Sequence, residues 1–247
     1  MLISGKLGTG RPSIKHVIWI FCIALFVRSI YVYIFVESSY FLSEDQTLYI
    51  QLAYQFQSSD FLGVTPQRVP GYPLFLSTIF SVAGKGLWNV VFIQILLDSI
   101  SCVVIALLAK SIFGRGFWIA GVLSAINLNM VVLSATLLTD TLFLFLFVLF
   151  LFSLFQYLKT KSIKWFFFLV LFITLATLVR AVSYYLLPIL LIAILSWRFW
   201  QKDSGLKIIK LTVLYLSVVG ILLGGIHQRN YQQYGSTAFV SQTGAAV

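Results

Sequence analysis

The chain has 247 residues, of which 60% are hydrophobic and only 10% charged, with a formal net charge of +10. Soluble domains carry about 25% charged residues, so this composition excludes a soluble globular domain and indicates an all-α polytopic membrane protein. The basic excess does not indicate nucleic-acid binding, because such a footprint needs a clustered basic face and the Lys and Arg residues flank apolar segments instead.

Seven segments meet or approach the roughly 20 apolar residues that a transmembrane helix needs. In chain order they are residues 16–36, 87–109, 117–138, 141–158, 165–180, 182–197 and 208–226. The first is expected to be an uncleaved span, since its apolar run continues past Arg28 with no small-residue cleavage site. The sequence therefore predicts one transmembrane domain over residues 1–247, with about seven spans.

Two apolar stretches decide how often the chain crosses the bilayer. As a helix, residues 71–83 would cover about 20 Å, short of the roughly 30 Å hydrocarbon core, so we expect a re-entrant or interfacial helix there. Residues 165–197 could form one long helix, but we prefer a hairpin that turns near Arg180. These choices predict a large first outer loop, about residues 37–86, that carries interfacial helices. They also predict an outer C-terminal segment of about residues 227–247.

The basic residues gather in the short loops on one side of this topology. They are Lys6, Arg11, Lys15, Lys110, Arg115, Lys159, Lys161, Lys164, Arg198, Lys202, Lys207 and Lys210. By the positive-inside rule this side is cytoplasmic, with the N-terminus inside the cell. The ionisable residues left on the outer side are Glu37, Glu44, Asp45, Asp60, Asp140, Arg68, Lys85, Arg180 and Arg229. We therefore expect any chemistry at the extracytoplasmic face of the cell membrane.

Two adjacent carboxylates open the outer loop. Ser43 and Gln46 have the spacing of a capping box, which would put Glu44 and Asp45 in the first turn of a helix. The helix dipole stabilises carboxylates there, and it would also keep Asp45 ionised and able to accept a proton or bind a cation. An electrostatic and a functional role are both open at this point. Asp45 and Tyr49, four residues apart, lie on one helical face.

Asp140 and Arg180 stand at the outer ends of other predicted spans. Thr139 could cap the fourth span, so Asp140 is either a first-turn acid or a site residue. Arg180 lies between two apolar runs, where a charge is costly, and it either snorkels to the interface or serves a site.

Two ionisable residues lie deeper in the predicted spans. Arg28 is near the outer end of the first span, and we expect it to snorkel outward. Asp98 shares a helical face with Gln94 and Ser101, which favours an interhelical hydrogen-bond cluster over a proton relay.

In this order, these stretches resemble the GT-C superfamily of polytopic glycosyltransferases, nearest to the bacterial branch related to protein O-mannosyltransferases and lipid A aminoarabinose transferases. The matching elements are Asp45 with Tyr49 and Ala53, residues 70–74, Gln94, Phe113 with Gly114, residues 139–143, residues 178–180, and residues 229–231 with Gly235. Asp140 stands where the family usually has Glu, and Ala181 where it has Pro. Family members usually continue with several more helices, so we expect this chain to be a fragment, a truncated gene product or a minimal form.

The resemblance implies transfer of a sugar from a polyprenyl-phosphate donor to a glycan, lipid or protein acceptor, with inversion at the anomeric carbon. It makes Asp45 the general base. Cationic side chains would stabilise the leaving phosphate, and the candidates are Arg180, Arg229, Arg68 and Lys85. The candidates for positioning the acceptor or a metal are Asp140, Glu44 and Tyr49. Metal use varies across the superfamily, so a divalent cation such as Mg²⁺ or Mn²⁺ is left open.

A non-catalytic function is the alternative: a lipid-sugar flippase or transporter, or an inactive partner subunit of a transferase. A transporter predicts polar residues through the membrane midplane and paired broken helices. Here the ionisable residues crowd one face and only Asp98 is central, which favours the enzyme.

Overall fold

The computed structural model describes residues 12–37, 43–58 and 68–235, and within these ranges the chain is helical with no strand. The elements in chain order are α1 (Ile14–Phe35), α2 (Glu44–Gln57), α3 (Gly71–Ala83), α4 (Leu87–Phe113), α5 (Phe117–Ala125), α6 (Leu128–Ser134), α7 (Thr139–Thr160), α8 (Ile163–Val179), the 3₁₀ helix η2 (Ala181–Tyr185), α9 (Leu186–Trp200) and α10 (Gly205–Tyr234). The all-α prediction is confirmed, including the short helix over residues 71–83.

Among the described residues, five helical stretches are long and apolar enough to cross a membrane: α1, α4, α7, η2 with α9, and α10. A sixth crossing results if α5 and α6, which meet at 53°, count as one span. The protein is therefore a polytopic membrane protein, but the count of about seven spans is not confirmed. The difference comes from α8, whose 17 residues fall short of a full crossing.

Asn127 explains why residues 117–138 do not form one straight span. Its side chain accepts a hydrogen bond from the Met130 N–H at 3.1 Å, so it caps the start of α6. Asparagine at an N-cap starts a new helix rather than continuing the previous one. A single polar residue in an apolar run barely lowers the hydropathy, which is why the bend was not predicted.

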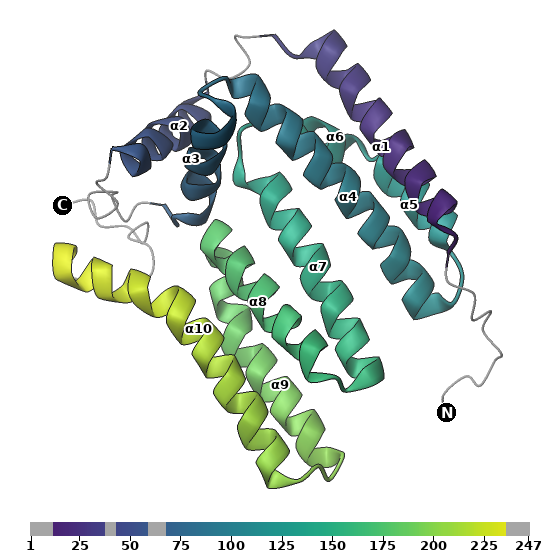
Figure 1. Ribbon diagram of the computed structural model, residues 1–247, viewed down its shortest axis with the longest axis vertical. Coiled ribbons are helices and arrows are strands. Elements are labelled where there is room, and N and C mark those ends of the chain that lie inside the picture. The colour runs from purple at the N-terminus through teal and green to yellow at the C-terminus, as the bar shows by residue number, and fades with distance from the viewer. Residues whose placement is uncertain (1–11, 38–42, 59–67, 236–247) are drawn as a thin grey trace.

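The helices run back and forth between two ends of the molecule (Figure 1). The backbone is extended at Arg180 (φ −145°, ψ 115°), and after it the chain turns back, as the predicted hairpin requires. Lys161 Nζ donates to Gln201 Oε1 at 3.1 Å, which brings the end of α9 beside the turn between α7 and α8. The helices α8 and α9 are therefore antiparallel.

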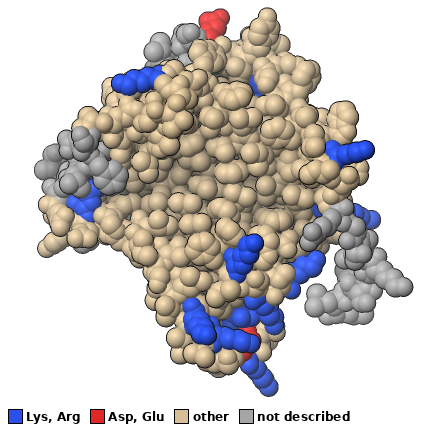
Figure 2. All heavy atoms as spheres, viewed as in Figure 1, with Lys and Arg blue, Asp and Glu red and all other residues tan. Residues whose placement is uncertain are grey.

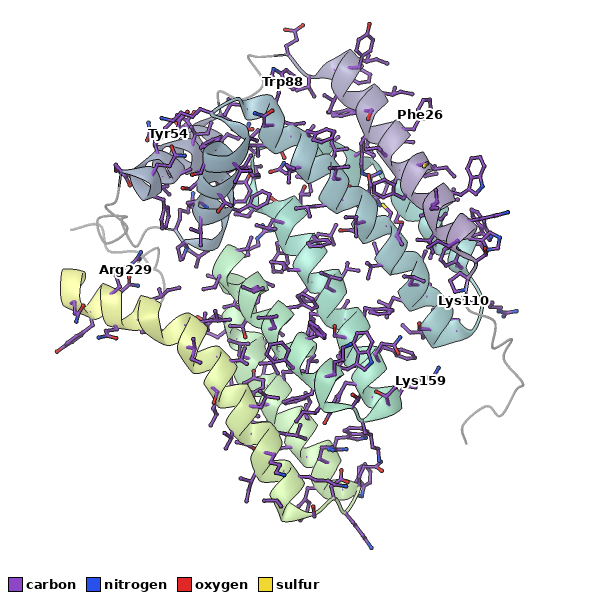
Figure 3. The ribbon with its side chains drawn as sticks, in the orientation of Figure 1. Phe26, Tyr54, Trp88, Lys110, Lys159 and Arg229 are labelled. Atoms are coloured by element: carbon purple, nitrogen blue, oxygen red, sulfur yellow. The ribbon has the colours of Figure 1, made fainter. Side chains whose placement is uncertain are left out.

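Lys and Arg side chains are concentrated toward one end of the molecule but are not confined to it. Lys110 and Lys159 lie at one end, and Tyr54, Trp88 and Arg229 lie at the opposite end (Figure 3). Figure 2 shows Lys and Arg side chains gathered at the lower end of the molecule. We call the end with Lys110 and Lys159 the basic end, and the end with α2 and α3 the α2/α3 end.

The α2/α3 end has its own hydrophobic cluster, to which α2, α3, α4, α7 and α8 contribute. The Tyr49 and Tyr72 rings meet edge to face with centroids 5.1 Å apart. Gly71 begins α3 directly against the end of α8: a Cβ there would lie 2.5 Å from the Leu178 carbonyl oxygen. Only glycine permits such a close backbone approach, and this contact holds α3 against the residues that lead into Arg180.

Arg28 does not snorkel as predicted. It is fully buried, with its Nε 2.5 Å from Asp98 Oδ2 and its Nη1 3.0 Å from the Ala125 carbonyl oxygen. A charge away from water needs such partners, and here α4 supplies Asp98 and α5 supplies the Ala125 carbonyl. The interhelical hydrogen-bond cluster predicted at Asp98 is confirmed, but its partner is Arg28 of α1. The Ser101 hydroxyl donates to a carbonyl of its own helix instead.

Candidate active site

A cavity of about 320 Å³ opens at the α2/α3 end. Four segments far apart in the sequence surround it: α2, the residues before α3, the start of α7, and the turn from α8 into η2. Its charged and aromatic lining residues are Asp45, Tyr49, Arg68, Asp140 and Arg180. The fold therefore gathers five of the eight predicted site residues around one space.

Asp45 forms the first ion pair of the cavity. It lies in the first turn of α2, where the helix dipole stabilises a carboxylate, and its Oδ1 is 2.7 Å from Arg68 Nη2. The Arg68 guanidinium also lies 6.0 Å from the Tyr49 ring centroid. Its Nε is buried and has no acceptor among the described residues, so Arg68 keeps a donor that this pair does not use.

Asp140 and Arg180 form the second ion pair, with Nη1 and Oδ1 2.6 Å apart. Asp140 lies in the first turn of α7, and the Arg180 guanidinium lies 5.8 Å from the Phe143 ring centroid. Thr139 does not cap this helix as predicted. Leu138 occupies the cap position and Thr139 is the first helical residue.

Both ion pairs are open to solvent on one side. The Asp45 side chain is 61% exposed and that of Arg180 is 48% exposed. Ion pairs with this exposure contribute about 0–1 kcal/mol, so a ligand can replace either partner at little cost. The two arginines and the two carboxylates of the cavity can therefore each leave their partner to bind a ligand.

Tyr49 lies between the pairs and is almost buried. Burial raises the pKa of its phenol above the ordinary value, and the Arg68 charge opposes this shift only in part. The hydroxyl therefore keeps its proton at neutral pH and can donate a hydrogen bond.

Three predicted site residues lie outside this cavity. Glu44 is exposed in the first turn of α2. Lys85 Nζ lies 5.1 Å from the Tyr54 ring centroid. Arg229, on α10, is buried and donates to Asn230 Oδ1 at 2.9 Å.

Parts of the predicted outer segments lie outside the described residues. They are Asp60 with the rest of residues 59–67, residues 38–42, and residues 236–247 of the predicted C-terminal segment. The described part of that segment continues α10 as far as Tyr234.

The predicted capping box does not form, because Ser43 makes no side-chain bond to the helix backbone. Gln46 is instead buried: its Nε2 donates to Ser43 Oγ at 2.8 Å, and its Oε1 accepts from the Leu137 N–H at 2.9 Å. Sequence reasoning missed this role. Gln46 shares the buried face of α2 with Tyr49 and Ala53 at helical spacing, so a polar residue on that face was the available signal.

A second cavity of about 280 Å³ lies beyond the Asp140–Arg180 pair. It reaches toward Asp98 and is otherwise lined by Asn129, Met130, Leu133, Thr141, Phe143 and Leu144. The ion pair therefore lies between a charged cavity and a largely apolar one.

The described ranges contain no group of three or more His, Cys, Asp or Glu side chains that could hold a metal ion. Asp45 and Asp140 each have an arginine partner instead. The described residues thus provide no ready ligand set for the divalent cation that was left open.

Comparisons with known proteins are consistent with this architecture. Residues 66–222 match the model of the dolichyl-phosphate-mannose-protein mannosyltransferase family. The fold is similar to a chain of the S. cerevisiae protein O-mannosyltransferase Pmt1-Pmt2 complex bound to the sugar donor, with a TM-score of 0.64 and 13% sequence identity. This likeness covers 93% of the present chain and 35% of the yeast chain. A search of curated proteins found no match.

Proposed function

The chain belongs to the dolichyl-phosphate-mannose-protein mannosyltransferase family of GT-C membrane glycosyltransferases, and from that premise we propose that it transfers a sugar from a polyprenyl-phosphate donor to an acceptor hydroxyl. The observation that carries the proposal is the cavity that joins Asp45 and Tyr49 to two arginines. The family description names mannose on a lipid phosphate as donor and protein as acceptor, so these are the first substrates to test.

Asp45 is the general base of the proposed reaction. Its carboxylate takes the proton of the acceptor hydroxyl while that oxygen attacks the anomeric carbon. The bond from the anomeric carbon to the phosphate oxygen breaks, and its electron pair leaves with the phosphate. A single displacement of this kind inverts the anomeric centre.

Arg68 and Arg180 are the proposed partners of the leaving phosphate, because both line the cavity and carry a fixed positive charge. Each is paired with a carboxylate in the structure, which a donor phosphate can replace. Replacing Asp45 as the partner of Arg68 also frees the base for the acceptor. Lys85 and Arg229, which lie elsewhere, have weaker support for this role than the sequence suggested.

The second cavity supports a lipid-linked donor in particular. Its largely apolar lining begins where the charged cavity ends, at Arg180 and Asp140. A phosphate at Arg180 would therefore let its lipid continue along apolar side chains. Asp140 and Tyr49 are the proposed acceptor-positioning groups.

The proposed orientation puts the basic end in the cytoplasm of the cell and the cavity at the extracytoplasmic face, in accordance with the positive-inside rule. We also propose that the chain forms a single transmembrane domain. A transporter has less support, since the ionisable residues deep in the helices, Arg28 and Asp98, are already paired with each other.

The test is sugar transfer in membranes from cells that express the protein. Radiolabelled mannose on a polyprenyl phosphate should label a protein acceptor, and membranes without the protein should not. Equal labelling from a nucleotide-linked mannose, with synthesis of the lipid donor blocked, would contradict the proposal.

A further inference from the structure

Two buried glutamines hold opposite sides of one peptide unit next to the cavity. Gln94 Nε2, from α4, donates to the Thr136 carbonyl oxygen at 2.6 Å. Gln46 Oε1, from α2, accepts from the Leu137 N–H at 2.9 Å. The carbonyl of residue 136 and the N–H of residue 137 belong to the same peptide unit. Hydrogen bonds therefore hold this unit on both of its edges.

The hydrogen bonds continue at both ends of this clamp. On one side, the Tyr72 hydroxyl of α3 donates to Gln94 Oε1 at 2.6 Å. On the other side, Gln46 Nε2 donates to Ser43 Oγ at 2.8 Å. We call this chain of groups, from Tyr72 through Gln94, the 136–137 peptide and Gln46 to Ser43, the glutamine relay.

Apart from Ser43, which is exposed, the relay is closed to water. Tyr72 and Gln94 are fully buried and Gln46 is 4% exposed. A hydrogen bond is strong in such surroundings, and losing one partner leaves the other with the full cost of desolvation. These bonds therefore fix geometry more firmly than the solvent-exposed ion pairs of the cavity do.

The hydrogen bond between Leu137 and Gln46 in the relay lies close in sequence to both acids of the cavity. Gln46 is the residue after Asp45, in the first turns of α2, and Leu137 precedes Asp140 by three residues at the start of α7. The hydrogen bond from the Leu137 N–H to Gln46 Oε1 joins these two helix starts through the 136–137 peptide. The relay therefore ties the backbone that carries Asp45 to the backbone that carries Asp140.

We propose that Gln46 and Gln94 are positioning residues, which set the separation of Asp45 and Asp140 through the 136–137 peptide. This inference rests on the proposed function, because the separation matters only if both acids serve one reaction. Misplacing a reacting group by about 1 Å can cost on the order of 10²-fold in rate, so the loss of either amide should slow turnover without removing a group that binds donor.

The test compares Gln46→Met and Gln94→Met with a matched control, Gln57→Met. Gln57 also lies on α2, and its Nε2 donates to Ser77 and Ser81 of α3, so it joins helices without contacting the relay. We expect kcat to fall about 10-fold or more in the two relay variants, with the donor KM unchanged, and to stay at the wild-type value in Gln57→Met. The double variant should lose little more than the worse single one, because both changes release the same peptide.

If a methionine substitution impairs folding, the more conservative variant Tyr72→Phe can be used in its place. It removes only the hydroxyl at the far end of the relay and should give a smaller fall in kcat of the same kind. A raised donor KM with unchanged kcat in these variants would overturn the positioning role.

Hydrogen–deuterium exchange of the protein in nanodiscs tests the hydrogen bonds of the relay independently of enzyme activity. The Leu137 amide should exchange slowly in the wild type and in Gln57→Met, and faster in Gln46→Met and Gln94→Met. Fast exchange in the wild type would overturn the relay whatever the activity. Faster exchange in Gln46→Met and Gln94→Met with an unchanged kcat would overturn the proposal that these glutamines position the two acids. Absence of transfer in the wild type, with the expected exchange pattern, would refute the proposed function and leave the relay standing.

Discussion

The two acids of the cavity differ in exposure and in the arginine that each one holds. Asp45 is largely exposed beside Arg68, whereas three quarters of the Asp140 side chain is covered beside Arg180. An exposed carboxylate that can leave its partner suits a base that must meet an acceptor hydroxyl. A covered carboxylate suits the acceptor-positioning role proposed for Asp140.

Reversing the second pair separates a structural role of Arg180 from phosphate binding. In the double variant Asp140→Arg with Arg180→Asp, opposite charges still face each other, but the positive charge moves from the α8–η2 turn to α7. We expect the double variant to fold and to transfer sugar about 100-fold more slowly or worse, since loss of one positioned charge-stabilising group costs about 10²–10³ in rate. The measurement is initial transfer rate at saturating donor.

Lys85→Gln is the control for this experiment, since Lys85 lies against Tyr54 outside the cavity, and its rate should not change. Recovery of the wild-type rate in the double variant, with both single variants impaired, would mean that Arg180 serves only the ion pair.

At the residue scale, the sequence predicted which side chains share a location but not which ones touch. The placement of Asp45, Arg68, Asp140 and Arg180 at one end follows from loop position, which hydropathy reports. Pairing depends on the rotation of each helix about its axis and on the backbone at Arg68 and Arg180, which lie outside the α-helices. Hydropathy reports neither of these. The burial of Arg28 against Asp98 was mispredicted for the same reason.

At the element scale, the position of the cavity depends on how closely α3 approaches α8. Gly71→Ala should destabilise the protein by about 1–3 kcal/mol, as overpacking does, because its Cβ would meet the backbone at Leu178. It should also slow transfer, since the displaced segment leads into Arg180. Thermal unfolding in detergent and the transfer rate measure the two effects.

Gly205→Ala is the matched control. Its Cβ would meet nothing within 4 Å at the start of α10, so stability should be unchanged or rise by about 0.4–1 kcal/mol. Equal behaviour of the two alanine variants would show that the α3–α8 contact is looser than the structure has it.

Most helix boundaries were predictable to within about four residues, but α10 runs to Tyr234, eight residues past the predicted end of its span. Two other departures have local causes. Residues 71–83 and the turn at Arg180 were predicted from length and from charge. The bend at Asn127 comes from one side-chain cap, and the role of Gln46 comes from a contact 91 residues away. Neither cause has a periodic signal in the sequence.

At the scale of the whole molecule, the concentration of Lys and Arg side chains toward one end predicts the orientation in the membrane. In a Cys22→Ser background, where the remaining Cys102 is buried, a cysteine at position 85 should react with a membrane-impermeant maleimide added to intact cells. A cysteine at position 161, at the basic end, should react only after permeabilisation. The reverse pattern would put the cavity in the cytoplasm and exclude the proposed orientation.

Composition was sufficient to predict a polytopic helical membrane protein, because no soluble fold covers so much apolar surface. The number of crossings was not predictable to the same degree. Short helices such as α8 and bent pairs such as α5 with α6 have the hydropathy of a span without its length or straightness.

The central claim is that Asp45 removes the acceptor proton, and Glu44 provides its closest control. Both are exposed carboxylates in the first turn of α2, but only Asp45 lines the cavity. The decisive measurement is the transfer rate from a polyprenyl-phosphate mannose donor in Asp45→Asn and Glu44→Gln, compared with the wild type. We predict a loss of about 10²–10⁴-fold in Asp45→Asn, as expected for a missing general base, and a rate near the wild type in Glu44→Gln. Wild-type transfer by Asp45→Asn would contradict the assignment of the base.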